Sequence, residues 1–241
     1  DLGGPNAGTP WTDAFLARYS AAGNRLWIRQ FGTSGTDKAR ALAPDDTGGA
    51  MVAGYTGGSL GGAYAGRGDV FLARYDSAGN QLWIRQFGTD RTDKAFALAP
   101  DGAGGVMIAG ETTGSLGGPS AGFWDVFLAR YDSAGNQLWI SQFGSSSTDV
   151  ARALAPDGAG GVMVAGWTDG GLGGPNAGDS ADVFLARYDS AGNELWIRQF
   201  GTRGWDEATG LTPDGAGGVI VTGRIYVSTG VWGTRVTLTP S

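Results

Sequence analysis

One pattern of about 56 residues occurs four times along the chain, and this repeat constrains the fold more than any other feature. The motif Asp-x-Phe-Leu-Ala-Arg-Tyr begins at Asp13, Asp69, Asp125 and Asp182, with spacings of 56, 56 and 57 residues. A Leu-Trp-Ile triplet follows each copy, and a Pro-Asp pair follows each triplet. Periods near this length are typical of solenoids and propellers.

Each repeat contains four short apolar runs, which we interpret as β-strands. In the third copy of the motif these runs are 125–131, 138–143, 151–155 and 162–165. Gly, Pro, Asp, Ser or Asn residues bound every run, as expected for strands joined by tight hairpin turns. No segment carries apolar residues at helical spacing over several turns, so the sequence predicts an all-β protein.

The runs are apolar on both faces, which favours sheets that are packed on both sides, as the blades of a propeller are. We label the strands of a blade A to D from the axis outwards. The prediction is one domain, 1–241, forming a β-propeller with four blades of four antiparallel strands. Three complete blades are expected at 38–88, 94–144 and 151–201.

The fourth blade is expected from 207–241, completed by 1–32, so that N- and C-terminal strands pair and close the ring. Such closure leaves no open sheet edge. A larger ring assembled from two chains is the alternative. The pairing of 233–239, which resembles a further strand C, stays open.

A family resemblance becomes visible at residues 153–168, Ala-Leu-Ala-Pro-Asp-Gly-Ala-Gly-Gly-Val-Met-Val-Ala-Gly-Trp-Thr. A glycine-rich loop follows, and then Asp-Val-Phe-Leu-Ala-Arg-Tyr-Asp-Ser-Ala-Gly-Asn at 182–193. This string resembles the bacterial β-propeller repeat called SBBP, and the resemblance recurs over nearly the whole chain. It implies a propeller in a surface or secreted bacterial protein, and it brings no catalytic motif.

The composition excludes several function classes. The 241 residues include no cysteine and no histidine, which removes disulfides, thiolate chemistry, Ser-His-Asp triads and most zinc sites. The formal net charge is −6 and no basic stripe is present, so we expect no nucleic-acid partner. No run is long and apolar enough to predict a membrane span. The chain lacks an initiator methionine and shows no signal peptide, so we expect a trimmed mature chain in an extracellular or periplasmic location.

The long B–C loops, 55–68, 111–124 and 167–181, are the expected binding face, together with the D–A loops. At the first position after the glycine of strand B, the backbone pattern repeats while the side chain changes, which indicates a role outside the fold. Aromatic side chains there could stack on sugar rings or grip a peptide. The predicted ligand-binding residues are Trp11, Tyr55, Tyr64, Glu111, Trp124, Trp167 and Arg224.

A ring of carboxylates is expected where each strand A begins, formed by Asp37, Asp93, Asp149 and Asp206. Four converging carboxylates could bind a hard cation such as Ca²⁺ in the axial channel. The alternative interpretation is that each aspartate accepts backbone N–H groups of its own turn. No other cofactor is expected.

The predicted function is a secreted or surface binding module that recognises carbohydrate. One alternative is a structural or protein-interaction scaffold with no small ligand. Another is a carboxylate-based glycoside hydrolase or lyase, although no catalytic motif is present and we expect no enzyme. The expected partner is a glycan or surface protein, and the expected state is a monomer, with a homodimer as the alternative.

Overall fold

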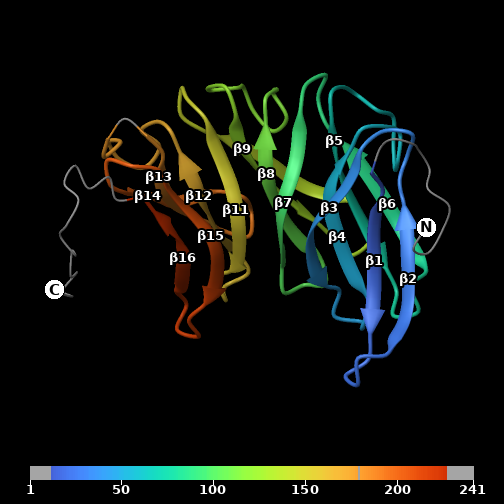
Figure 1. Cartoon of the computed structure of the whole chain (residues 1–241). Coiled ribbons are helices and arrows are strands. Elements are labelled where there is room, and N and C mark those ends of the chain that lie inside the picture. Colours follow the sequence, from blue (N-terminus) through green and yellow to red (C-terminus); the bar gives the residue numbers. More distant parts are fainter. Residues whose placement is uncertain (1–11, 179, 227–241) are drawn as a thin grey trace, which may run out of the picture.

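A computed structural model describes residues 12–178 and 180–226, and its regular structure there consists of antiparallel β-strands (Figure 1). The first complete blade contains β3 (Asp37–Pro44), β4 (Ala50–Thr56), β5 (Asp69–Tyr75) and β6 (Gln81–Phe87). The second contains β7 (Asp93–Pro100), β8 (Val106–Thr112), β9 (Asp125–Tyr131) and β10 (Gln137–Phe143). The third contains β11 (Asp149–Pro156), β12 (Val162–Thr168), β13 (Asp182–Tyr188) and β14 (Glu194–Phe200).

Each complete blade follows chain order from its first to its fourth strand. The first strands of successive blades, β3, β7 and β11, contact one another along the inside of the fan (Figure 1). The order of strands A to D and the blade boundaries therefore agree with the sequence to within two residues. The structure supports propeller-like blades.

Two half-blades complete the described chain. β1 (Ala14–Tyr19) pairs with β2 (Arg25–Phe31), and β15 (Asp206–Pro213) pairs with β16 (Val219–Ile225). They form two separate two-stranded sheets, at opposite ends of the fan (Figure 1). The expected pairing of 13–19 with strand B of the last repeat is not formed, because the turn from each blade to the next leaves the ends apart after four repeats. Closure of the ring is therefore not shown, and 233–239 lies outside the described residues.

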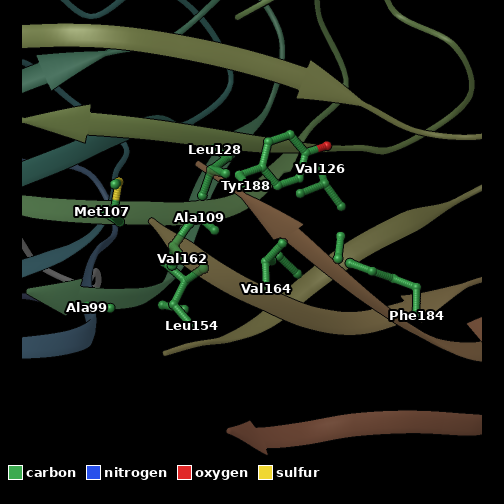
Figure 2. Close-up of a cluster of buried hydrophobic side chains, with 13 residues drawn as sticks. Ala99, Met107, Ala109, Val126, Leu128, Leu154, Val162, Val164, Phe184 and Tyr188 are labelled. Carbon is green, nitrogen blue, oxygen red and sulfur yellow. The ribbon is translucent and has the colours of Figure 1, made fainter. Parts of the chain in front are cut away.

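The core lies between blades rather than within one sheet. Figure 2 shows Val126 and Leu128 of β9 together with Val162 and Val164 of β12 in one buried cluster. The aromatic contacts follow the same rule, since Phe87 of β6 meets the edge of Phe127 on β9 at a centroid distance of 6.0 Å. Packing on both faces explains why the strands B and C do not alternate between apolar and polar residues.

A bulge in strand A brings its backbone against a glycine of strand B. The register between β7 and β8 shifts between Ala95 and Ala97, opposite Gly110. A Cβ atom at Gly110 would lie 1.9 Å from the Lys94 carbonyl oxygen. The same close approach recurs at Gly54, Gly166 and Gly223, so the backbone of strand A leaves no space for a side chain at these positions.

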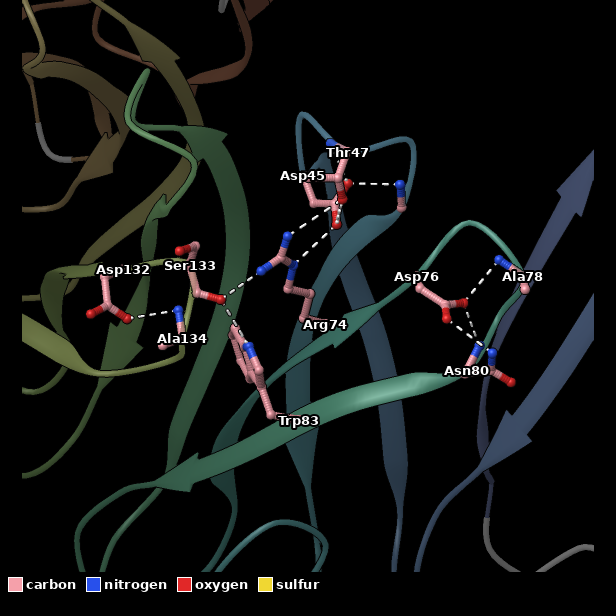
Figure 3. Close-up of polar contacts among 11 residues, drawn as sticks. Asp45, Thr47, Arg74, Asp76, Ala78, Asn80, Trp83, Asp132, Ser133 and Ala134 are labelled. Atoms are coloured by element: carbon pink, nitrogen blue, oxygen red, sulfur yellow. Dashed lines mark hydrogen bonds and ion pairs between the residues drawn. The ribbon is translucent and has the colours of Figure 1, made fainter.

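Polar side chains connect each blade to the next (Figure 3). Arg74 Nε lies 3.0 Å from the buried Asp45 carboxylate of its own blade, and its Nη1 donates to the Ser133 carbonyl of the following blade at 2.8 Å. The indole Nε1 of Trp83 donates to the same carbonyl at 3.0 Å. The Trp83 ring covers Gly135, where a Cβ would lie 2.9 Å from it. We call this Arg–Trp set the inter-blade clamp.

In the third blade, the aspartate of the A–B turn contributes to the loss of stability at low pH. Asp157 accepts the N–H groups of Ala159 and Gly161 at 2.8 Å and pairs with Arg187 at 2.9 Å. Burial alone raises the pKa of Asp157, but these contacts outweigh it and hold the pKa below the ordinary value of 3.8. The unfolded chain therefore binds more protons than the native one as the pH falls through this range, and stability is lost there.

We expect Asp157→Asn to lower the free energy of unfolding by about 1–3 kcal/mol at neutral pH. Because the variant has no carboxylate to protonate at this position, its free energy of unfolding should fall less than that of the unaltered protein when the pH is lowered. Urea unfolding at about pH 7 and about pH 3 measures both effects. Asp90→Asn, at an exposed loop position, is the matched control. An unchanged acid loss in Asp157→Asn would contradict the assignment to this carboxylate.

Candidate functional site

Five side chains from the three complete blades form a contiguous group, which we call the central cluster. They are Arg40 on β3, Tyr55 on β4, Lys94 on β7, Glu111 on β8 and Arg152 on β11. Lys94 Nζ lies 3.2 Å from Glu111 Oε1 and 5.7 Å from the centroid of the Tyr55 ring. The Arg40 guanidinium also lies 5.7 Å from that centroid, so the cations of two blades share one aromatic ring.

The register of strands A and B places this group. Lys94 lies directly opposite Glu111, and Lys38 lies opposite Tyr55 at the equivalent pair of the first blade. Since the first strands of successive blades are neighbours, side chains at equivalent positions come within reach across the blade boundary.

The central cluster contains more positive than negative charges. Glu111 is buried, and burial raises the pKa of its carboxyl against the opposing effect of Lys94, Arg152 and Arg40. One carboxylate thus stands among three cations, in a chain whose formal net charge is −6. A second anion at this surface would be stabilised by the cations that Glu111 leaves unneutralised.

Aromatic rings support the cations. Lys94 Nζ lies 4.8 Å from the centroid of the Trp124 ring, and the Arg152 guanidinium lies 4.7 Å from that of Phe96. Cation–π contacts at these distances hold the charged groups in place without neutralising them. The positive charges of Lys94 and Arg152 are therefore held in place against the rings of Trp124 and Phe96.

A cleft of ≈ 780 Å³ opens beside the central cluster, between two B–C loops and the intervening D–A loop. Its lining residues include Arg67, Arg91, Ser115, Phe123 and Trp124. Phe123 is 76% exposed, and Trp124 belongs to both the cleft and the rim of the cluster. The cleft lies on the face that the sequence predicts for binding.

The predicted ligand-binding residues divide into those that join this site and those that do not. Tyr55 and Glu111 belong to the central cluster, and Trp124 lines the cleft. Trp167 differs from the prediction of an exposed aromatic, because it is 7% exposed and its ring packs on Trp205 at 4.7 Å.

Of the remaining three residues, the structure describes two, and both lie away from the central cluster and the cleft. Tyr64 is exposed on the first B–C loop and is absent from the cleft lining. Arg224 pairs with Glu207 at 3.2 Å, on the C-terminal half-blade. Trp11 lies outside the described residues.

The four aspartates proposed for Ca²⁺ hold the turn before strand A. Asp93 accepts the Thr89 N–H at 2.6 Å and the hydroxyl groups of Thr89 and Thr112. Asp37, Asp149 and Asp206 accept the equivalent turn N–H groups. Within residues 12–178 and 180–226, no group of three acidic side chains is arranged as metal ligands. These hydrogen bonds match the alternative interpretation of local turn capping.

Sequence reasoning missed Arg40, Lys94 and Arg152. A signal was available, because the position of Lys94 is Lys38, Val150 and Glu207 in the other repeats. Strand A therefore varies between repeats at this position, as strand B does at Tyr55 and Glu111.

Comparison with known proteins gives two distant relatives, and no protein-family model matches the chain. "Regulatory protein FlaEY" of Caulobacter vibrioides is 29% identical over 89% of this chain and 24% of its own length. "Uncharacterized WD repeat-containing protein L264" of Acanthamoeba polyphaga mimivirus is 24% identical over 56% of this chain and 12% of its own length. The chain thus spans a quarter or less of these relatives.

The likeness to a WD-repeat protein agrees with a propeller-like repeat, since WD repeats build propeller blades. Membership of the SBBP family, which the sequence suggests, is not confirmed. No helix that could cross a membrane occurs in the part of the chain that the structure describes.

Proposed function

We propose that the protein is a protein-interaction scaffold that binds an acidic segment of a partner protein at the central cluster and the adjoining cleft. The carrying observation is the excess of cations around Glu111, with Arg40, Lys94 and Arg152 supplied by three different blades. The likeness to a regulatory protein and to a WD-repeat protein favours an interaction role over an enzymatic one.

The chemistry of the site suits carboxylate-bearing side chains. An arginine guanidinium can bind a carboxylate through two parallel hydrogen bonds. Arg40 on β3 and Arg152 on β11 come from the two other complete blades, and both act electrostatically on Glu111. Exposed Phe123 offers an apolar contact in the lining of the cleft. An acidic segment with an apolar residue nearby fits both features.

A carbohydrate ligand, expected from the sequence, is less well supported by this geometry. Stacking on sugar rings needs open aromatic faces. Trp167 is buried against Trp205, and Lys94 lies over the Trp124 ring. The aromatics predicted for a glycan site therefore do not present one shared platform.

Fluorescence anisotropy with labelled oligoglutamate of about ten residues tests the proposal. We expect binding that weakens with added salt and falls about tenfold in the Arg40→Glu/Arg152→Glu double variant. Labelled oligolysine of the same length should not lose affinity in this double variant, because it does not bind the cations of the central cluster.

The matched control is Arg25→Glu/Arg203→Glu, which makes the same charge change at two exposed positions outside the central cluster. An equal loss of oligoglutamate affinity in both double variants would show that only the net charge of the protein matters. It would contradict binding at the central cluster. Failure of oligoglutamate to bind the unaltered protein would also contradict it.

A further inference from the structure

The two half-blades expose side chains that complete blades bury. Phe15 of β1 is 56% exposed, whereas the equivalent Phe71, Phe127 and Phe184 are 0% exposed. Tyr19 is 58% exposed, and its equivalents Tyr75, Tyr131 and Tyr188 are buried. At the other end of the fan, Phe200 of β14, on the third complete blade, is 50% exposed, whereas its equivalents Phe31, Phe87 and Phe143 are half-buried.

The aromatic contacts of the complete blades show what these three residues lack. Phe31, Phe87 and Phe143 each contact the phenylalanine and the tyrosine of the next strand C. Phe200 is the next residue in this series, and Phe15 and Tyr19 are the phenylalanine and tyrosine that match it. The exposed aromatics at the two ends of the fan are therefore complementary, because each end carries the rings that the other end lacks.

The strand edges are complementary in the same way. In the third blade, β12 pairs with β13 so that Val164 lies opposite Ala186 and Gly166 opposite Phe184. The same register, transferred to the half-blades, places Val221 of β16 opposite Ala17 of β1 and Gly223 opposite Phe15. A pair formed in this register completes a four-stranded blade from strands A and B of one end and C and D of the other.

An ion pair found in every complete blade has its two partners on different half-blades at the ends of the fan. Arg74, Arg130 and Arg187 of strand C pair with Asp45, Asp101 and Asp157 of their own A–B turns at 2.9–3.0 Å. The next aspartate is Asp214, which accepts the turn N–H groups of Ala216 and Gly218 as the others do. The next arginine is Arg18, which donates to the Ser77 carbonyl. Within the described residues neither forms the ion pair, because they lie at opposite ends of the fan.

The inter-blade clamp is also split. The rings of Trp27, Trp83 and Trp139 cover Gly79, Gly135 and Gly192 of the following C–D turn. Trp196 is the last ring of this series, and the C–D turn that follows in order is 20–24 of the N-terminal half-blade. Gly23 of that turn has a positive φ of 79° like its equivalents, yet nothing lies within 4 Å of its Cβ position.

We propose that a second copy of this chain occupies these edges, and that two copies pair head to tail into a closed ring. β16 of each copy pairs with β1 of the other, Asp214 pairs with Arg18, and Trp196 covers Gly23. Each copy supplies three complete blades and two halves, so two copies make a ring of eight. Propellers typically have 4–8 blades, which leaves three copies outside the range.

A second copy fits better than the chain's own ends. Figure 1 places β1–β2 and β15–β16 at opposite ends of an open fan, so closure within one chain would require every blade boundary to turn more sharply. Those boundaries are set by buried cores and by the inter-blade clamps, which recur with nearly the same distances. Pairing between copies needs no such change.

Cysteine cross-linking distinguishes the two closures, because the natural chain contains no cysteine. Opposite Cα atoms in an antiparallel pair lie about 4.5–5.5 Å apart, within the range that a disulfide spans. We expect an equimolar mixture of the single variants Ala17→Cys and Val221→Cys to give a covalent dimer on oxidation. Each single variant alone should give little, and Ala17→Cys mixed with Ile220→Cys, whose side chain points to the other face of the strand, should also give little.

A charge exchange supplies a second test that needs no oxidation. Arg18→Asp and Asp214→Arg should each lower the dimer fraction in light scattering, since each alone sets like charges at both junctions. Mixing the two variants restores opposite charges at both junctions, so we expect dimer to reappear with a mass of twice 24.6 kDa.

Several outcomes would overturn the proposal. A disulfide formed only within single chains of Ala17→Cys/Val221→Cys would show that the chain closes on itself. A monomeric mass without any cross-link would show that β16 pairs with β1 neither within one chain nor between two copies. Oligomers that keep growing beyond two copies would show an open array.

Discussion

Replacing Phe127 by alanine is expected to lower the free energy of unfolding by about 3–5 kcal/mol. The side chain is fully buried on β9 and packs among residues of two blades, including Leu72 of β5. It also meets the Phe87 ring edge-on, a contact with its own stabilising contribution. Alanine would leave a cavity in the seam between blades, which rigid sheets on either side cannot collapse to fill.

Leu138→Ala is the matched control, because Leu138 belongs to the same blade and also repeats in every copy. Its side chain is exposed at the start of β10. We expect its loss to cost less than about 1 kcal/mol. Equilibrium urea unfolding of both variants measures the difference, and equal losses would refute the view that the stability lies in the seams.

Gly110→Ala should be more damaging than its small added volume suggests, with a loss of at least about 3 kcal/mol and little soluble folded protein. The new methyl group would collide with the Lys94 carbonyl oxygen and approach the Ala95 Cα at 2.8 Å. Both are backbone atoms of the innermost strand, so no side-chain rotation relieves the overlap. β7 would have to move away from β8, and the contacts of β7 with β3 and β11 would go with it.

Gly118→Ala tests whether this effect belongs to the site rather than to any glycine. A Cβ at Gly118, in the B–C loop of the same blade, would lie 3.6 Å from Gln142 Cβ, an ordinary contact. We expect this variant to keep the stability of the unaltered protein within about 0.5 kcal/mol. Thermal unfolding followed by circular dichroism compares the two, and a normal melting temperature for Gly110→Ala would contradict the predicted collision.

The sequence predicts strands and blades well because both depend on local pattern. Turn residues such as Gly135 and Gly158 mark the hairpins, and the repeat period fixes how many strands each blade receives. Ring closure depends on a different quantity, the turn from one blade to the next. That turn is set by how Trp83 lies over Gly135 and how Phe87 meets Phe127, and the spacing of residues along the chain does not encode it.

The candidate site was predictable in part for a similar reason. Variation between repeats identifies Tyr55 and Glu111, because a residue that holds the fold is expected to repeat. The same criterion wrongly suggested an exposed side chain at Trp167, where a neighbouring residue particular to its own repeat, Trp205, covers the ring. Lys94 depends on two contacts that residue spacing does not give: its register opposite Glu111 and its approach to Tyr55 of the preceding blade.

The acceptors of the inter-blade clamp are main-chain carbonyls. Arg74 and Trp83 donate to the carbonyl of Ser133, and Arg85 donates to that of Gly135 at 3.1 Å. A carbonyl is present whatever side chain its residue carries, so these bonds survive most changes of sequence in the receiving turn. One blade can therefore be exchanged for another, and a gene that duplicates or deletes a whole unit still encodes blades that fit together.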